Sequence, residues 1–559
     1  MSEKPWLKFY DPNVPQHVEV PRTDLYSQLR PQAVEKANEV ALRFLGTSVT
    51  YAQLHEGIDT LAAALYARGV RQGDKVAILM ANSPQFIMSY FALLKLGAVA
   101  VLSNPLNVAR ELLFKFKDSG AKGVIALDLM SQKLNKIRDE VDLDFTIYTS
   151  LKEYMPFHLK LLFPLKMKMD KRVPPVEIEW DDKTVPFQKL LQEKNPAPSD
   201  PEIDPDSLAV LIYSGGTTGV SKGIMLSHFG LVANYMQAVS WVDVREGDSI
   251  LAVLPLFHGF GMSICMNAPL AMGGKVILLP RFDGNQVLQT IHKEKPTLFA
   301  GVPTMFVAFK EVPQIKEYDL TSLRGIFVGA APLPLPVMKE FEELTGAALI
   351  EGYGLTEAVT ALACNPLHGK RKPGTVGIPW PDVEWKIMDL EEGTREMPIG
   401  EPGEICIRCP ELMLGYLNQP EATARALRDG WLYTGDIGIM DEDGYVTIVD
   451  RLKDLVIVSG FNVFPSEIDE VLHQHPKVSE GVAVGLPHPR KGEYIKVYVV
   501  PRPGQTLTPE EIIQFCRENV APYKVPKEVE VREELPKSAV GKILRRELKE
   551  EEEAKAKAP

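Results

Sequence analysis

A loop rich in glycine and hydroxyl side chains, between residues 213 and 223, carries the clearest chemical signal in the sequence. It reads Tyr-Ser-Gly-Gly-Thr-Thr-Gly-Val-Ser-Lys-Gly and follows an apolar run, Leu208 to Ile212. Glycines let the backbone turn so that successive N–H groups point at one anion, and hydroxyls and a lysine add donors for phosphate oxygens. The Walker phosphate-binding pattern is not met, because Gly223 follows Lys222. A flexible surface turn is the competing interpretation of this loop taken alone. The candidate phosphate contacts are Ser214, Gly215, Gly216, Thr217, Thr218, Gly219 and Lys222.

Three later segments also carry reactive side chains. Residues 352–357, Gly-Tyr-Gly-Leu-Thr-Glu, combine an aromatic face, a hydroxyl and a carboxylate after an apolar run. An aromatic ring can stack on a nucleobase, and a carboxylate can hold Mg²⁺ beside phosphates. Asp436 ends a predicted turn, 431–436, and its carboxylate could accept hydrogen bonds from two ribose hydroxyls. Lys542 follows a glycine near the end of the chain and is a candidate mobile cation. By themselves, the last two segments also fit an ordinary turn and a solvated basic helix start.

Short apolar runs alternate with amphipathic stretches over the first 350 residues, and this alternation must position those side chains. Strand–helix alternation predicts parallel sheets covered by helices. A helix is expected from Ser83 to Leu96, because Ser-Pro is a helix-start signal. The predicted strands are 75–80, 98–102, 122–126, 145–148, 276–279, 297–300, 325–328 and 348–351.

The pattern changes after residue 383. Short strands separated by glycine, proline and acidic turns predict an antiparallel meander or small barrel, with strands at 384–388, 403–408 and 445–449. Beyond Leu452 the sequence predicts a small α+β domain, with strands near Val456, near Val482 and at 494–500, and helices at 465–474 and 509–520. The expected fold is α/β: a large N-terminal domain (1–450, with 383–450 as a small β subdomain), a hinge (451–453) and a small mobile C-terminal domain (454–559).

Composition excludes several classes of protein. The chain has 559 residues, 45% of them hydrophobic and 24% charged, which is ordinary for a folded multidomain protein and not for a disordered one. A net charge of −12 argues against a general nucleic-acid binder. Five cysteines cannot make a disulfide framework, and Cys406 and Cys409 are expected to be two structural thiols rather than a metal site.

The sequence predicts a cytoplasmic protein. Its first residues lack the apolar core of a signal peptide, and the uncharged stretch from Ser249 to Gly274 is interrupted by prolines and glycines. That stretch is expected to form buried strands and turns, not a membrane span. Residues 151–172 differ: six basic and two acidic residues give a local charge of +4 among apolar side chains. This segment either contacts the inner face of an anionic membrane or covers the core as a loop, and Pro156 and Pro164 should prevent one long helix.

Taken together, the motifs resemble those of the adenylate-forming (ANL) superfamily, which includes acyl-CoA synthetases, firefly luciferase and the adenylation domains of peptide synthetases. The resemblance extends from Tyr51-Ala-Gln-Leu54 to Arg546 and is greatest to bacterial-type long-chain fatty acyl-CoA ligases. Supporting features are the Tyr-x-Gly-Gly-Thr-Thr-Gly form of the loop, Tyr154-x-Pro-Phe157 and the stretch 450–464. The loop departs from the commoner family pattern in having Ser214, Gly215 and Ser221.

The resemblance implies a role for each motif. The loop would embrace the β- and γ-phosphates of ATP, and Asp436, assisted by Arg451, would bind the ribose. Lys542 would bridge the attacking carboxylate and the α-phosphate. Residues 352–357 and 329–331 would hold the adenylate: Thr356 on the α-phosphate, Glu357 on Mg²⁺, and Tyr353, between Gly352 and Gly354, on adenine beside Gly329, Ala330 and Ala331.

In the family, a second step passes the acyl group to the thiol of CoA after the small domain rotates about a hinge residue, which aligns here with Lys453. The resemblance places Ser459, Gly460 and Phe461 along the pantetheine tunnel. His258 would lie at the acyl site and tunnel mouth, although a lone histidine in an apolar run is usually a core residue. The expected acyl pocket includes His258, Gly301, Val302, Gly329 and Ala358.

The expected function is therefore ATP-dependent activation of a medium- or long-chain fatty acid to an acyl-adenylate and its transfer to CoA, with Mg²⁺, ATP and CoA required. A fatty acyl-AMP ligase, an aryl-CoA ligase and a catalytically silent acyl- or nucleotide-binding regulator are the alternatives. The expected partners are these small molecules and no nucleic acid, and a homodimer is an open expectation.

Overall fold

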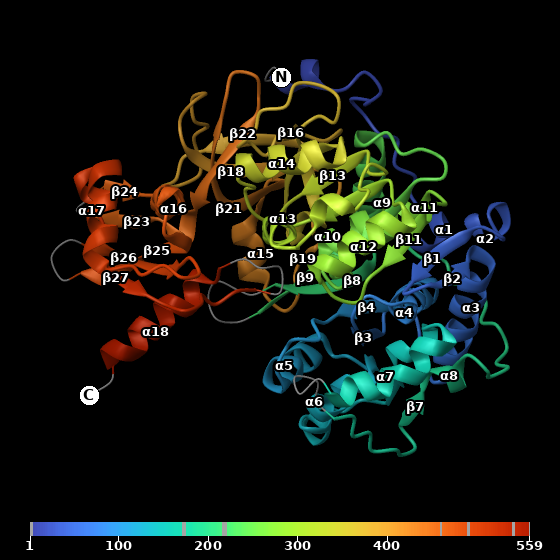
Figure 1. Ribbon diagram of the computed structural model, residues 1–559. Coiled ribbons are helices and arrows are strands. Elements are labelled where there is room, and N and C mark those ends of the chain that lie inside the picture. The colour runs from blue at the N-terminus through green and yellow to red at the C-terminus, as the bar shows by residue number, and fades with distance from the viewer. Residues whose placement is uncertain are drawn as a thin grey trace. The chain divides into compact units, whose positions relative to one another are not determined.

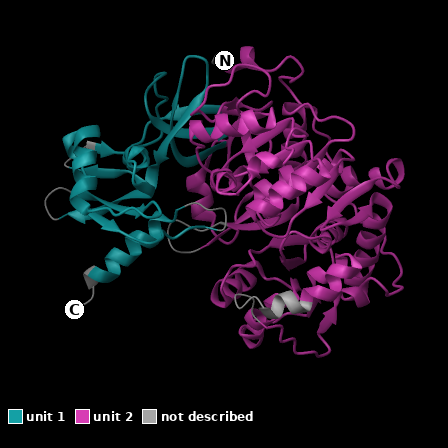
Figure 2. Ribbon diagram, in the orientation of Figure 1, with its two compact units in different colours: residues 1–5, 385–407, 431–559 teal, residues 6–384, 408–430 magenta. Residues whose placement is uncertain are grey.

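The computed structural model describes residues 4–169, 175–214, 221–458, 461–488, 492–538 and 543–557. The chain divides into two compact units (Figures 1 and 2). Unit 1 comprises residues 1–5, 385–407 and 431–559, and unit 2 comprises residues 6–384 and 408–430. The α/β fold class predicted from the sequence is confirmed.

The first sheet of unit 2 is a largely parallel sheet that ends in an antiparallel edge. Strands β3 to β8 pair in parallel, whereas β9 runs antiparallel to both β8 and β19. The strands predicted at 75–80, 98–102, 122–126 and 145–148 are confirmed to within one residue at either end. In spatial order the sheet contains β19 (Gly415–Tyr416), β9 (Lys222–Ser227), β8 (Leu208–Ser214), β4 (Val99–Leu102), β3 (Lys75–Leu79), β5 (Gly123–Leu127), β6 (Phe145–Thr149) and β7 (Thr184–Pro186).

The second sheet of unit 2 has a topological switch point in its middle. From β10 the chain passes to β11 on one side and then returns to β12 on the other, and all these pairings are parallel. Ligands of open parallel sheets bind beyond the carboxyl ends of the strands at such a point. In spatial order the sheet contains β16 (Ile378–Pro379), β15 (Ala361–Cys364), β14 (Ala348–Gly354), β13 (Gly325–Val328), β12 (Leu298–Gly301), β10 (Ser249–Ala252), β11 (Lys275–Leu278), β1 (Val40–Phe44) and β2 (Thr47–Thr50).

Several helices of unit 2 begin at start signals in the sequence. In α4, the Ser83 hydroxyl accepts a hydrogen bond from the Phe86 N–H at 3.3 Å, and Pro84 occupies the first turn. The helix predicted from 83 to 96 is thereby confirmed. The helices are α1 (Leu25–Leu29), α2 (Gln32–Glu35), α3 (Tyr51–Ala67), α4 (Pro84–Lys95), α5 (Ala109–Ser119), α6 (Ser131–Asn135), α7 (Phe157–Met169), α8 (Phe187–Leu190), α9 (His228–Trp241), α12 (Gly284–Glu294), α13 (Pro303–Lys310), α14 (Leu335–Thr345) and α15 (Pro420–Ala426).

Two expectations for this unit hold only in part, and the departures from both concern proline. As expected, β10 opens the stretch 249–274, and the segment 151–172 is not one long helix, because the helical structure breaks before α7. The uncharged stretch 249–274 is buried as expected, but after β10 it forms a helical run, α10 (Gly259–Met262), the π-helix η5 (Ser263–Asn267) and α11 (Ala268–Ala271). Pro269 occupies the first turn of α11, where a missing N–H is tolerated. Helix α7 likewise continues through Pro164. Because proline has no N–H, the carbonyl of Lys160 loses one main-chain hydrogen bond there. Over the described ranges, no helix is long and apolar enough to cross a membrane.

Unit 1 begins with the predicted antiparallel β subdomain. Strands β18 and β22 both pair antiparallel with β21. The strands are β17 (Glu384–Met388), β18 (Gly403–Arg408), β21 (Trp431–Met440) and β22 (Val446–Arg451).

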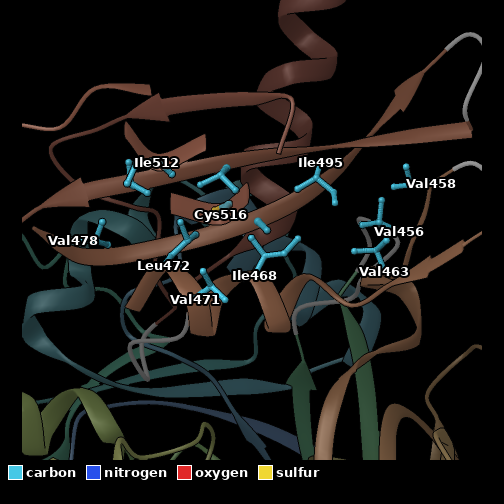
Figure 3. Packing of buried hydrophobic residues seen from close by; sticks show 13 residues of the cluster. Val456, Val458, Val463, Ile468, Val471, Leu472, Val478, Ile495, Ile512 and Cys516 are labelled. Carbon is cyan, nitrogen blue, oxygen red and sulfur yellow. The ribbon is translucent and has the colours of Figure 1, made fainter. Parts of the chain in front are cut away.

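The rest of unit 1 is a second sheet with helices packed on both faces. Side chains alternate between the faces of a strand, and here both faces are apolar. One face packs with α16 and α17 in the cluster of Figure 3, which joins Leu472 to Val456 and Ile495. The elements are β23 (Val456–Val458), β24 (Phe461–Val463), α16 (Pro465–Gln474), β25 (Val478–His488), β26 (Gly492–Pro501), α17 (Pro509–Asn519), β27 (Glu528–Val531) and α18 (Arg545–Lys557).

The opposite face of this sheet packs against the last helix of the chain. The charged run 549–557 suggests a frayed, solvated tail, but it belongs to helix α18. Leu548 is fully buried among Val482, Val484 and Tyr498. The ammonium of Lys496 lies 2.9 Å from a carboxylate oxygen of Glu552, which ties the helix to β26.

Candidate active site

The predicted acyl-pocket residues of unit 2 follow the carboxyl ends of neighbouring parallel strands. Gly301 ends β12, Gly329 follows β13, and Ala358 lies just beyond β14. His258 follows β10, the strand next to β12. Because carboxyl ends of parallel strands share one edge, residues far apart in the sequence come to one edge of the sheet, at the switch point.

Glu357 is held on both its backbone and its side chain. It lies in the 3₁₀ turn η7 (Thr356–Ala358), and its carbonyl accepts a hydrogen bond from the Met413 N–H at 2.7 Å. Its Oε1 accepts a hydrogen bond from the Tyr416 hydroxyl at 2.9 Å. Burial and the nearby Glu357 charge raise the pKa of Tyr416, so the hydroxyl keeps its proton and remains a donor.

Tyr416 also connects Glu357 to the predicted phosphate loop. The ammonium of Lys222 lies 4.4 Å from the centroid of the Tyr416 ring. Lys222 begins β9 and is paired with Ser214, the last residue of β8, so the two ends of the loop are adjacent. Sequence reasoning missed Tyr416, because its place depends on the pairing of β19 with β9, where Tyr416 lies opposite Ile224.

His258 has a structural role in addition to the predicted one. Its Nδ1 accepts a hydrogen bond from the Phe260 N–H at 3.3 Å and caps helix α10. Burial lowers the pKa of His258, so the ring is neutral at pH 7. A Cβ on Gly329 would come within 3.0 Å of the Phe260 ring, so this segment and the end of β13 are in close contact.

The segment after β13 is exposed to solvent, and contacts with its backbone hold it in place. Ala330 has φ +72°, and Ala330 and Ala331 are both exposed. Glu351 steadies the segment, because its Oε1 accepts a hydrogen bond from the Leu333 N–H at 3.0 Å. Tyr353, predicted to follow a strand, lies within β14, which extends to Gly354.

In unit 1 the structure brings Asp436 and Arg451 together. They are paired across β21 and β22, with Arg451 Nε 2.9 Å from Asp436 Oδ1. Asp436 does not end a free turn, as expected from the sequence, but lies in strand β21 beside Gly435, whose φ of +71° accompanies a bulge. Lys453 lies in the 3₁₀ turn η8 (Leu452–Asp454), and burial lowers its pKa.

Several predicted residues have no structural test. Residues 215–219, 459, 460 and 542 fall outside the described ranges, and for Phe461 only the backbone, at the start of β24, is described. Their roles stay predictions. The five cysteines are free thiols, as expected for Cys406 and Cys409.

The residues present fit a magnesium ion that arrives with a nucleotide. Mg²⁺ typically keeps several waters and takes one or two carboxylates plus substrate phosphates. Glu357 supplies one oriented carboxylate next to the end of the predicted phosphate loop. In the described part of the chain, no group of three or more His, Cys, Asp or Glu side chains could hold a metal by itself.

Comparison with known proteins gives matches along the whole chain. The long-chain-fatty-acid–CoA ligase of Bacillus subtilis is 41% identical over 558 residues, covering 99% of this chain and 98% of that protein. The enzyme of the same name from Escherichia coli O157:H7 is 37% identical over 561 residues, covering 99% of each. A feruloyl-CoA synthase from Amycolatopsis is 35% identical over 512 residues, covering 91% of this chain and 95% of that protein.

Solved structures match the fold. An anthranilate CoA ligase bound to anthranoyl-AMP has a TM-score of 0.83 at 28% identity, covering 97% of this chain and 99% of that one. ATP-bound MatB from Rhodopseudomonas palustris has a TM-score of 0.82 at 29% identity, covering 95% and 99%. The models of the AMP-binding enzyme and of its C-terminal domain match residues 29–417 and 467–542. The chain therefore belongs to the AMP-binding enzyme family.

Proposed function

We propose that this chain is an ATP-dependent, AMP-forming fatty acid–CoA ligase. The observation that carries the proposal is its match to long-chain-fatty-acid–CoA ligases over almost the full length of both chains. Lys222, Tyr416 and Glu357 lie together beside the carboxyl ends of the strands in the second sheet of unit 2. This grouping supports the proposal, because it suits a nucleotide that carries Mg²⁺.

The first step joins a carboxylate to ATP and releases pyrophosphate. Both reactants are anionic, so cations and aimed donors must offset their repulsion where charge develops in the transition state. We assign the loop from Ser214 to Lys222 to the β- and γ-phosphates, Thr356 to the α-phosphate, and Lys542 to the attacking side. Mg²⁺, held by Glu357, would supply charge neutralisation at the phosphates when bound.

We assign adenine recognition and ribose recognition to separate sets of residues. Tyr353 and the segment 329–331 would hold the adenine, and Asp436 the ribose. The close pair of Asp436 and Arg451 supports the latter, because the guanidinium orients the buried carboxylate to accept hydrogen bonds.

For the second step we propose that Lys453 is the hinge between residues 1–450 and 454–559. A rotation there would withdraw Lys542 and bring Ser459, Gly460 and Phe461 to the path of the CoA thiol. The 3₁₀ turn at 452–454 supports this role, because a short element end can absorb a change of backbone angles.

The acyl pocket is proposed to lie at the edge where His258, Gly301, Val302, Gly329 and Ala358 gather. The neutral His258 ring suits an apolar substrate better than an imidazolium would. Each buried methylene contributes about 0.8 kcal/mol, so an aliphatic chain needs no polar anchor.

The test is pyrophosphate release from ATP and Mg²⁺ with acids from acetate to oleate, together with ferulate and anthranilate, each with and without CoA. We expect release that needs a fatty acid and accelerates with CoA. Lys542→Ala should abolish it, whereas Lys537→Ala, which removes an exposed partner of Glu480 nearby, should not. Pyrophosphate release with aryl acids alone would indicate an aryl-CoA ligase instead. Release that CoA does not accelerate would indicate an acyl-AMP ligase. No release with any acid would indicate a binding protein without catalytic activity.

We further propose that helix α7 contacts the inner face of an anionic membrane. Phe157, Leu161 and Leu162 are 76%, 65% and 59% exposed, and Lys160 beside them is exposed. Apolar side chains next to lysines favour an anionic lipid surface. Wild-type protein should co-sediment with anionic vesicles and release at high salt, and a Phe157→Ser, Leu161→Ser, Leu162→Ser variant should stay in the supernatant. Equal sedimentation of the two proteins would contradict the proposal.

A homodimer is proposed as well, and sedimentation equilibrium tests it by giving either one or two chain masses.

A further inference from the structure

The backbone at Val359 adopts a conformation that β-branched residues rarely take. Its φ is +63° and its ψ −62°, and the side chain is fully buried. The Thr360 N–H donates a hydrogen bond to the Ala358 carbonyl at 2.6 Å, which closes a three-residue γ-turn around Val359. A γ-turn of this hand is rare and strained, and such strain persists only where the surrounding structure holds it.

Two glycines allow neighbouring segments to approach the turn closely. A Cβ on Gly259 would lie 2.2 Å from the Val359 carbonyl oxygen. A Cβ on Gly354 would lie 1.7 Å from the Thr360 carbonyl oxygen. Neither approach is open to any other residue type, so the turn fits between helix α10 and the end of β14 only because both neighbours lack side chains.

The turn comes directly after Glu357 and Ala358. The far side of the turn is also fixed, because the Asn234 amide donates a hydrogen bond to the Ala361 carbonyl at 2.7 Å. The chain thus runs from β14 through Glu357 and then into the turn. Relaxing Val359 to an ordinary conformation would redirect that exit and move Glu357 relative to Tyr416, with which it shares a 2.9 Å hydrogen bond.

We infer that Val359, braced by Gly259, is a positioning residue that orients Glu357 for nucleotide-bound Mg²⁺. Because Gly259 follows His258, the same contact joins the acyl-site segment to the carboxylate on which the nucleotide depends. The inference rests on the proposed function, which supplies Mg²⁺ and ATP as ligands, and it adds a positioning role for a residue that has no individual role among the predictions from sequence.

The test compares two substitutions of Val359. Val359→Ala trims the side chain but keeps a Cβ, and therefore the same restriction on positive φ. Val359→Gly removes that restriction, so position 359 can keep φ +63° without strain. Calorimetry measures ATP binding with and without Mg²⁺, and pyrophosphate release is measured in parallel. We expect Val359→Ala, which keeps the strain and loses the packing that holds it, to reduce the Mg²⁺-dependent gain in ATP affinity about 10-fold and to leave Mg²⁺-free binding unchanged, with Val359→Gly close to wild type.

Two further variants sharpen the comparison. Gln314→Ala shortens another non-glycine residue of unit 2 with positive φ (+64°), so it should leave both readouts unchanged. Gly259→Ala should reproduce the Val359→Ala defect by displacing the carbonyl, and if it does not fold, the Val359 pair still decides. Equal effects of Ala and Gly at position 359, or wild-type behaviour of Val359→Ala, would overturn the inference. Wild-type protein that binds ATP with Mg²⁺ but releases no pyrophosphate with any acid would refute the proposed function and leave the binding comparison intact.

Discussion

The Tyr416 hydroxyl is the most direct handle on the candidate site. Tyr416→Phe deletes one hydroxyl and retains the ring under the Lys222 ammonium. A hydrogen bond to a charged group contributes about 1.5–3 kcal/mol, and each 1.4 kcal/mol corresponds to about a factor of ten. If Glu357 holds the metal in the transition state, kcat/KM for fatty-acid-dependent pyrophosphate release should fall roughly 10- to 100-fold. The raised pKa of Tyr416 keeps its hydroxyl protonated, so the ratio of wild-type to variant rates should not change with assay pH.

A matched variant separates this effect from the loss of any buried hydroxyl. Tyr235 donates a hydrogen bond to Gln28 Oε1 at the same distance, 2.9 Å, in the same unit. Tyr235→Phe should leave the rate within about twofold of wild type. The reasoning is refuted if Tyr416→Phe keeps wild-type activity at limiting Mg²⁺, or if both variants lose activity equally.

Three further predictions concern stability and pH. Leu548→Ala should lower the free energy of unfolding of unit 1 by about 2–5 kcal/mol in urea denaturation, because Leu548 is fully buried. Asp469→Asn should lower the free energy of unfolding by about 1.5–3 kcal/mol, because Arg545 loses its carboxylate partner. Both side chains of this pair are only about one-sixth exposed. Burial raises the pKa of Glu411 to about 7, so the neutral carboxyl is favoured in the folded state. Its contribution is complete below the unfolded-state pKa and is lost as pH rises through about 7. Glu411→Gln should therefore gain stability relative to wild type between about pH 5 and 8.

Asp469→Asn has a control within the chain, and each of the three predictions has an outcome that would contradict it. Glu550→Gln breaks the exposed pair with Arg546 and should cost less than about 0.5 kcal/mol. A loss as large as that of Asp469→Asn would contradict the buried-pair argument. Unchanged unfolding of Leu548→Ala would mean that α18 is not packed on the sheet. Parallel stability–pH curves for wild type and Glu411→Gln would show that this carboxyl does not titrate differently in the folded state.

Local signals were enough to predict many of the strands and several helices. Strands buried on both faces give continuous apolar runs, and the run 325–328 is strand β13 with the same bounds. Pro465 marks the start of α16, also as predicted. The errors occur where a local signal has two meanings. Pro164 and Pro269 suggest breaks but lie within or at the start of helices, and the charges of 549–557 conceal that Leu548 anchors α18.

The sequence by itself determined the family, the α/β class and the chemical types at the site, because motifs and periodicity are properties of neighbouring residues. Only the tertiary structure decided which distant residues meet. The pairing of β19 with β9 brings Tyr416 to Glu357 and Lys222, across more than 50 residues in one case and almost 200 in the other. The close approach of Gly259 to Val359 likewise exists only once β10 and β14 belong to one sheet of unit 2, in which β12 and β13 lie between them. Such contacts follow from strand order and register, which no local pattern encodes.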